Sequence, residues 1–475
     1  MADLLLRGAA HLWTGLPGAA MRHRAGTDIR VRGNLIAAIG TLEPEPGERV
    51  IDAAGCVIYP GWVNTHHHLF QSLLKGIPAG INLPLVPWLA AVPVPYRRFF
   101  DDERVLRIAA RIGLVELMLS GCTTVADHQY LYYPGMPYDA SAIVFDEAEK
   151  LGLRFVLCRG GQTVARDFDR HAPPQAAPET LEAFMASVEA DVHRYHDPSP
   201  TSMRRVASAI TTPNWSCRED ELKPLAREAR RLGIRLHSHW CETHDYVRWA
   251  REVQGCTPMQ FLERHEWVGP DVWFAHMVHL GDRDLQSCAE SGTGIAHCPQ
   301  SNGRLGSGIA RVPELMRAGA AVSLAVDGAA SNEAADMLSE AHACWLLHRA
   351  DPRAGERDGL QPGGNAAAMT IEDVVHIGSA GGARVLGLDG VGTLQAGMAA
   401  DFALYELDQP RHFGLHDAAI GPVASGGAAS LKALLVNGRV VVEAGAVPGL
   451  DMAGLRREAQ ALVDPMGARQ GDGRG

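Results

Sequence analysis

The chain has 475 residues, of which 46% are hydrophobic and 21% charged, and its formal net charge is −11. This composition is that of a folded globular protein with a sizeable core. The acidic balance argues against broad nucleic-acid binding, which requires a basic surface.

The N-terminus and the cysteines indicate where the protein works. The segment Met1–Arg7 has an early acidic residue and an arginine within its only apolar run, so it is a poor signal peptide. No apolar run approaches the ~20 residues needed to cross a bilayer. The nine cysteines are scattered without paired spacing, which favours free thiols in a reducing compartment. We therefore expect a cytoplasmic protein that binds neither nucleic acid nor a membrane.

Short strands joined by turns are predicted near both ends of the chain. Apolar runs at 28–31 and 35–40 show little helical periodicity. Similar runs return at 400–405 and 434–442, and the second contains an Asn-Gly turn typical of a hairpin. We expect residues 1–59 and 390–475 to join into one small composite β-sandwich domain.

Between these segments, residues 60–389 alternate short β-rich runs with helical stretches, several of which end in glycine. Such alternation predicts a parallel sheet, and eight βα units predict an α/β fold of the closed (β/α)8 type, a TIM-like barrel. An open doubly wound sheet is the alternative. It would need a glycine fingerprint after its first strand, where this chain has histidines. After the opening run, the predicted strands are 123–127, 154–157, 206–211, 234–239, 272–275, 294–297 and 322–327.

Three consecutive histidines end the first predicted strand of the barrel. Because residues two apart on a strand face the same side, His66 and His68 are expected to face one way and His67 the other. Two imidazoles directed into one space at a strand end can supply two of the ligands of a metal site.

Later strands supply further polar residues at their carboxyl ends, where the active sites of barrels lie. These residues are His239, His276, His297 and Asp327. Nitrogen and carboxylate ligands suit zinc, with iron or cobalt as alternatives. His66, His68, His239 and Asp327 would hold one divalent ion and leave room for a water, which is the arrangement of a catalytic site.

The spacing of these residues matches a known set of motifs. They are Asn64-Thr65-His66-x-His68, His239-x-x-Glu242, His276, His297-Cys298-Pro299-x-Ser301-Asn302 and Asp327-Gly328-x-x-Ser331-Asn332. Together they resemble the amidohydrolase superfamily, in particular its aminohydrolase branch, which includes guanine deaminases and triazine hydrolases. The late segment Gly392-x-x-x-x-Gly397-x-x-Ala400-Asp401 resembles the return of that family's chain into its β domain.

The resemblance implies roles for individual residues. His66, His68, His239 and Asp327 match the metal ligands of the family, Glu242 its proton shuttle, and His276 the histidine that hydrogen-bonds the attacking water. Asp327 would also take the proton that this water releases. The fourth strand ends without the lysine that two-metal members carry, and this difference implies a single metal ion.

The resemblance also implies a zinc-dependent aminohydrolase that removes the amine of a fused 2-amino-4-oxo heterocycle. A pterin such as isoxanthopterin is favoured, with 8-oxoguanine and the amino or chloro substituents of a triazine as alternatives. We expect the small-molecule substrate to contact Gln71, Trp88, Arg159 and His297, although packing, or an ion pair for Arg159, would also explain them. A metal-binding protein without turnover is a further alternative, and a homodimer is left open.

Overall fold

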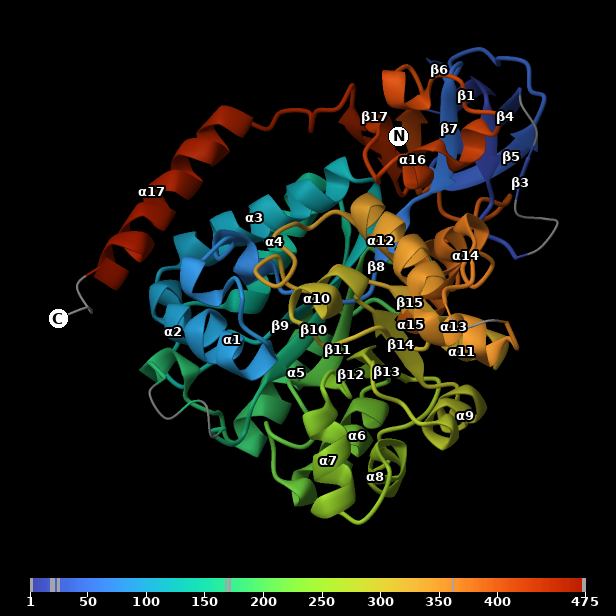
Figure 1. Ribbon diagram of the computed structural model, residues 1–475. Helices are drawn as coiled ribbons and strands as arrows, with labels where there is room; N and C mark the ends of the chain where they lie inside the picture. The colour runs from blue at the N-terminus through green and yellow to red at the C-terminus, as the bar shows by residue number, and fades with distance from the viewer. Residues whose placement is uncertain are drawn as a thin grey trace.

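The computed structural model describes residues 3–17, 22–23, 26–166, 169, 172–360 and 363–471. An eight-stranded parallel sheet forms its centre, and the strands follow one another in chain order (Figure 1). They are β8 (Trp62–Asn64), β9 (Cys122–Gln129), β10 (Arg154–Gly161), β11 (Arg204–Ile210), β12 (Arg235–Trp240), β13 (Val272–His276), β14 (Gly294–His297) and β15 (Ala321–Leu324).

The first and last strands of this sheet meet just beyond their carboxyl ends. His67 and Asp327 form a parallel bridge, and the Asp327 amide donates to the His66 carbonyl at 3.1 Å. The Val326 amide donates to the Asn64 side-chain oxygen, also at 3.1 Å. The sheet therefore closes into a barrel at the histidine segment, and the predicted α/β barrel fold is confirmed.

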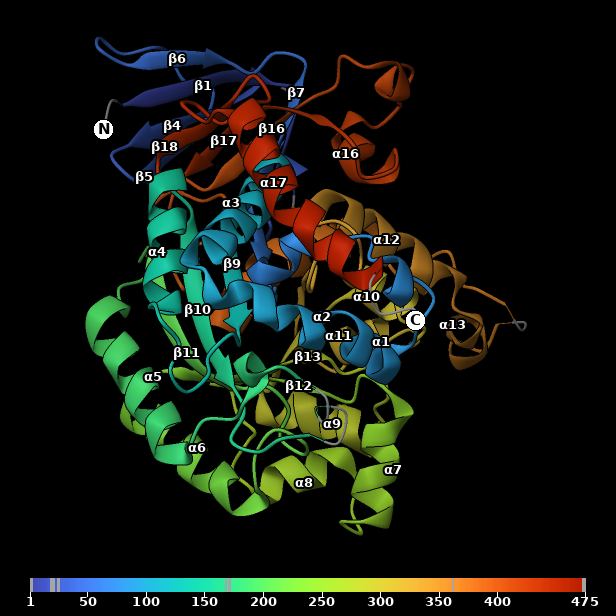
Figure 2. The same cartoon turned by 90° about the vertical axis from the view of Figure 1, so that its left-hand side faces the viewer.

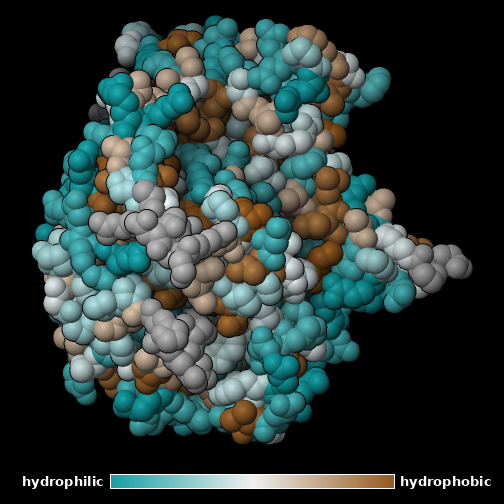
Figure 3. Space-filling view, turned by 60° about the vertical axis from the view of Figure 1, so that its left-hand side comes forward, coloured by the Kyte–Doolittle hydropathy of each residue, from teal (hydrophilic) through white to brown (hydrophobic). Residues whose placement is uncertain are grey.

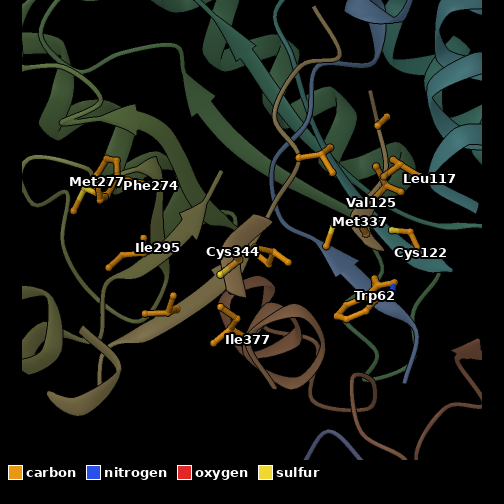
Figure 4. Close-up of a cluster of buried hydrophobic side chains, with 14 of the residues drawn as sticks. Trp62, Leu117, Cys122, Val125, Phe274, Met277, Ile295, Met337, Cys344 and Ile377 are labelled. Atoms are coloured by element: carbon orange, nitrogen blue, oxygen red, sulfur yellow. The ribbon is translucent and has the colours of Figure 1, made fainter. Parts of the chain in front are cut away.

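Helices surround the barrel because each presents an apolar face to the outside of the strands. In the core shown in Figure 4, Trp62 of β8 and Val125 of β9 lie in one buried cluster with Leu117 and Cys344 of the helical layer. The longer helices are α3 (Glu103–Leu119), α4 (Ala140–Leu151), α5 (Leu181–Tyr195), α6 (Leu222–Arg231), α7 (His244–Glu252), α8 (Pro258–Arg264), α9 (Asp282–Ser291) and α12 (Met337–Ala350). Shorter ones are α10 (Pro299–Arg304), α11 (Val312–Arg317), α13 (Pro352–Arg357), α14 (Ile371–His376), α15 (Gly382–Leu386) and α16 (Gly421–Ala424).

Two sheets built from both ends of the chain pack face to face beside the barrel. One has the order β5-β4-β1-β6 and the other the order β18-β17-β16-β7-β2-β3. Their shared core contains Leu6 and Ile29 from the first sheet and Ile58, Phe402 and Leu435 from the second. The extra β layer from the two termini is thus present as expected, while the residue limits 1–59, 60–389 and 390–475 stay a prediction. The strands are β1 (Leu4–Ala9), β2 (His11–Trp13), β3 (Arg22–His23), β4 (Thr27–Arg32), β5 (Leu35–Gly40), β6 (Arg49–Asp52), β7 (Cys56–Pro60), β16 (Phe402–Glu406), β17 (Ser430–Val436) and β18 (Arg439–Glu443).

Two helical regions were not predicted from the sequence. The first lies between β8 and α3 and contains η2 (Leu69–Leu73), α1 (Leu85–Ala91), α2 (Pro93–Tyr96) and η4 (Arg97–Asp101). The second is α17 (Met452–Gly471), which runs beside α3 (Figure 2). Both contribute to one buried apolar cluster, in which Leu455 and Met466 of α17 join Trp88 and Phe100.

The outer surface is mixed in character. On the coloured part of the face in Figure 3, hydrophobic residues show in small groups among hydrophilic ones. Within the described ranges, no helix is both long enough and apolar enough to cross a membrane.

A buried ion pair joins the barrel to the six-stranded sheet. Arg154, at the start of β10, pairs with Asp401, which directly precedes β16, and both side chains are almost inaccessible to solvent. Arg154 also donates to the Ser202 carbonyl at 2.9 Å, and Asp401 accepts from the Asn437 amide at 2.6 Å. These hydrogen bonds compensate much of the cost of burying two charges.

We expect Asp401→Asn to lower the free energy of unfolding by about 3–5 kcal/mol, because it leaves the buried Arg154 charge without a counter-charge. Thermal and urea unfolding would measure the loss. Arg457→Ala, which removes the exposed ion pair with Asp451, serves as the control and should change little. Equal effects of the two substitutions would contradict this account of Asp401.

Candidate active site

Five side chains from four strand ends meet at the carboxyl end of the barrel. His66 and His68 follow β8, His239 lies in β12, His276 ends β13, and Asp327 follows β15. All five are buried. The structure thus brings together the metal-ligand candidates predicted from the sequence.

The donor atoms of this group lie close to one another. The two Nε2 atoms of His68 and His239 are 3.1 Å apart. Asp327 Oδ1 lies 3.2 Å from His66 Nε2 and 3.3 Å from His68 Nε2. His276 Nε2 is somewhat farther, at 4.0 Å from Asp327 Oδ2. Donors at these separations can share one ion.

Backbone carbonyls fix the tautomer of two of the histidines. His68 Nδ1 lies 2.8 Å from the His128 carbonyl oxygen, and His239 Nδ1 lies 2.7 Å from that of Thr211. A carbonyl oxygen only accepts, so each Nδ1 carries the proton and donates. The Nε2 atom of each ring is therefore left with a bare lone pair that points into the group.

A backbone carbonyl also fixes the tautomer of His66, but it acts through the ring of His237. Its Nδ1 lies 3.1 Å from the Trp273 carbonyl oxygen and must donate there. Its Nε2 then accepts from His66 Nδ1 at 2.8 Å, which leaves His66 Nε2 bare. His237 has no assigned role in the motifs described above, yet it lies two residues before His239, and period-two spacing alone could have identified it.

The three bare nitrogens need a cation between them. Two lone pairs that face each other at 3.1 Å, as in His68 and His239, repel unless a positive centre lies nearby. Burial lowers the pKa of His66, His68 and His239, so the rings stay neutral, the form that binds metals. Three imidazole nitrogens and a carboxylate oxygen form a donor set that fits zinc.

Asp327 is held in a single orientation. Its Oδ2 accepts from the hydroxyls of Ser301 at 2.6 Å and Ser331 at 3.1 Å, and its Oδ1 accepts from the Gly328 amide at 2.7 Å. Burial opposes the carboxylate charge of Asp327, but the histidines around it, among them His66 and His276, hold its pKa well below its usual range. Asp327 also has a φ of 63°, a left-handed conformation that is uncommon outside glycine.

His276 reaches the site because the backbone turns at its own position. Phe274, two residues earlier, points outward into the helical layer, and regular alternation would send His276 the same way. Its φ of 75° breaks the alternation, and its side chain lines the cavity instead. His276 Nδ1 donates to the Asn302 side-chain oxygen at 3.0 Å, and its Nε2 lies 3.5 Å from Glu242 Oε2. Burial raises the pKa of Glu242 to about 7.

A cavity of about 630 Å³, which includes space open to solvent, leads to these residues. Gln71 and Trp88, both predicted to contact the substrate, lie in its wall. The Gln71 amide nitrogen donates to the Tyr130 hydroxyl at 3.1 Å. The Gln71 side chain also lies against Gly328, where a Cβ would meet it at 2.0 Å. The complete lining is His68, Gln71, Leu85, Trp88, Leu89, Pro93, Val94, Arg97, Tyr130, Arg166, Thr211, Thr212, Trp215, His239, Glu242, Tyr246, His276, Leu305 and Asp327.

The other two predicted contacts lie outside this lining. Arg159 is buried between β10 and α5, where its guanidinium forms two hydrogen bonds of 2.7 Å with Glu179. His297 faces α12, and its Nε2 lies 3.0 Å from that of His348. The structure therefore places Arg159 in the structural ion pair that was its alternative, and His297 in the helical layer. Arg97, Trp215 and Tyr246, which line the cavity, had not been identified from the sequence.

Comparison with known proteins identifies a family and several relatives. The Amidohydrolase family matches residues 57–441. Isoxanthopterin deaminase from an unknown prokaryotic organism is 54% identical over 465 residues, which cover 97% of this chain and 96% of that protein. The 8-oxoguanine deaminase of Pseudomonas aeruginosa is 35% identical over 437 residues, which cover 91% of this chain and 93% of that protein.

A solved structure gives the same result for the fold and bears on the metal. Atrazine chlorohydrolase TrzN from Arthrobacter aurescens TC1, complexed with zinc, superimposes with a TM-score of 0.87 at 28% identity. The match covers 97% of this chain and 100% of that one. The similarity therefore extends over both the barrel and the sheets formed by the chain ends.

We expect His237→Leu to weaken metal binding about 10- to 100-fold, because His66 loses the acceptor that fixes its tautomer. Competition with a chelator, read by elemental analysis, would measure the change. His193→Gln alters an exposed histidine on α5 and is the control. Unchanged metal affinity in the His237 variant would show that the hydrogen bond is not required.

Proposed function

The chain belongs to the amidohydrolase family, and from that premise we propose that it is a metal-dependent deaminase of fused 2-amino-4-oxo heterocycles. The observation that carries the proposal is the position of Glu242. This buried carboxyl group, with its pKa raised to about 7, opens into the same cavity as the cluster of histidines and Asp327. A carboxyl group that both gives and takes protons near neutral pH is what deamination requires.

The four groups with the shortest donor separations are proposed to hold one divalent ion, with zinc favoured and iron as the alternative. They are His66, His68, His239 and Asp327. Bound there, the ion would supply a water acidic enough to attack at neutral pH. His276 lies farther from Asp327 and nearer Glu242, so we assign it the orientation of that water rather than metal binding.

The protein's carboxylates then move the protons. Asp327, which is ionised, takes the proton released when the water attacks the amine-bearing carbon. Glu242 protonates the adjacent ring nitrogen and makes that carbon electrophilic. Asp327 then passes its proton to the amine nitrogen, which departs as ammonia, while the hydroxyl on the same carbon returns its proton to Glu242 and becomes a carbonyl. Water is consumed and no redox change occurs.

Isoxanthopterin is the proposed first substrate because the relative with that activity is 54% identical over nearly the whole chain. The 8-oxoguanine deaminase, at 35%, makes 8-oxoguanine the second candidate. In both compounds the amine-bearing carbon lies between two ring nitrogens, and the carbon beyond one of these nitrogens carries an oxo group. Gln71, with its amide at the cavity wall, is suited to pair with such an edge. Trp88 is proposed to form an apolar wall against the rings.

A substrate panel tests the proposal. We expect ammonia release from isoxanthopterin, with weaker release from 8-oxoguanine, and neither ammonia from cytosine nor chloride from a chlorotriazine. The same ammonia assay should be repeated with protein that has been stripped of metal and then reloaded with zinc or iron. Turnover of neither bicyclic compound by loaded protein would refute the proposed function.

We expect Glu242→Gln to keep its bound metal while kcat falls about 10²- to 10⁴-fold, since an amide cannot shuttle protons. Ammonia release and elemental analysis of the same sample would measure both quantities. Glu290→Gln, on the exposed side of α9, is the matched control. Loss of the metal from the Glu242 variant would instead identify Glu242 as a ligand.

A further inference from the structure

Arg97 is a buried cation in the wall of the cavity, and none of the described residues pairs with its charge. It opens η4, its side chain is only 2% exposed, and it lines the same space as Glu242. Among the residues that the structure describes, its guanidinium makes no hydrogen bond and no ion pair, and its Nε is fully enclosed. Its guanidinium carbon lies 5.0 Å from the centre of the Tyr130 ring.

The surroundings of Arg97 make this arrangement costly. Burial and the neighbouring Arg166 lower the pKa of Arg97 to about 10, so it stays charged at neutral pH. Asp169 does not neutralise it, because that carboxylate forms two hydrogen bonds with Arg166, at 2.8 and 2.9 Å. A buried charge persists when something pairs with it. Here the open side is the cavity, so the missing partner is a ligand.

Other unpaired polar atoms in the cavity wall strengthen this conclusion. Trp88 Nε1, Gln71 Oε1 and Glu242 Oε1 are buried and have no hydrogen-bond partner within the described residues. They form a set of donors and acceptors suited to a flat polar heterocycle. Within the described residues Arg97 forms no ion pair with Glu242 or Asp327, and since those two carboxylates are assigned to the amine-bearing carbon, Arg97 is left for another part of the ligand.

We propose that Arg97 binds an oxygen on the second ring of the substrate, the ring that does not carry the amine. The cavity would thereby select 2-amino-4-oxo bicycles whose second ring bears an oxo group, as a lactam or its anion. A guanidinium presents several N–H donors in a plane and suits such an oxygen. This inference rests on the proposed function and adds the feature of the substrate that the cavity selects.

Two matched pairs of compounds isolate that oxygen. Isoxanthopterin carries it and pterin does not, and 8-oxoguanine carries it and guanine does not. We expect the wild-type kcat/KM to favour the oxo member of each pair by on the order of 100-fold, since its absence leaves a buried cation unpaired. Arg97→Gln should remove most of that preference by raising KM for the oxo member, with a small effect on its partner.

Matched variants separate recognition from a structural effect. Arg97→Lys keeps a charge but loses the planar fork, so it should restore part of the preference. Arg98→Gln, at the neighbouring exposed position of η4, should leave all rates unchanged. Melting temperature and metal content would be recorded for each variant. Equal losses for both members of a pair would overturn the inference.

Binding without turnover keeps the inference separate from the proposed function. Fluorescence titration of the Glu242→Gln protein with isoxanthopterin and with pterin gives one dissociation constant for each compound. The same two constants are then measured for the double variant that also carries Arg97→Gln. A preference for isoxanthopterin that depends on Arg97 supports the inference even if the wild type releases no ammonia, which would refute the proposed function alone. Equal affinity for the two pteridines, or binding of neither, would overturn it.

Discussion

The protonation state of three buried histidines is the constraint on which the site depends. Carbonyl oxygens of His128, Thr211 and Trp273 accept hydrogen bonds from Nδ1–H groups on the far side of the rings, and the Trp273 carbonyl acts on His66 through His237. Each of these carbonyls belongs to a residue within a strand of the parallel sheet or to the residue that directly follows one. The register of the strands therefore sets the tautomers, and the tautomers leave the lone pairs that bind a cation. A shift of register would disturb the site even with all its ligands present.

Closure of the barrel is part of the same arrangement. The bridge between His67 and Asp327 places Asp327 against the histidine segment, and the His67 ring lies on the opposite side, near Gly113 of α3. A Cβ at Gly113 would meet Ser72 Oγ at 2.6 Å, Leu69 Cδ2 at 2.8 Å and His67 Nε2 at 3.2 Å, so glycine leaves room for the whole histidine segment. The His67 Nδ1 donates to the Asp327 carbonyl, so this histidine links the two strand ends while its neighbours face the candidate metal site, as the period-two spacing predicted.

The barrel fold could be predicted from strand periodicity, and the meeting of the histidines with Asp327 could be predicted from their positions at strand ends. The side chains that line the cavity could not be predicted in full, and Arg159 shows why. It lies two residues beyond the predicted strand 154–157 and shares the outward face with Leu157, which packs in the helical layer, so it meets Glu179. His297 likewise follows the face of Ile295. A prediction must therefore use both the position of a residue along its strand and the side of the sheet that it faces. His276 shows that a positive φ can reverse the side that alternation predicts.

The residues that we propose to recognise the substrate depend on a different part of the structure. Gln71, Trp88 and Arg97 all come from the segment between β8 and α3, which has no barrel periodicity and packs as its own apolar cluster. Leu455 and Met466 of α17 complete that cluster from the far end of the chain. The strand ends can thus hold the reactive groups rigidly, while a separately packed wall sets the shape and charge of the cavity. Changes in that wall, or in the helix behind it, would alter which heterocycle is accepted without moving the carbonyls that fix the histidines.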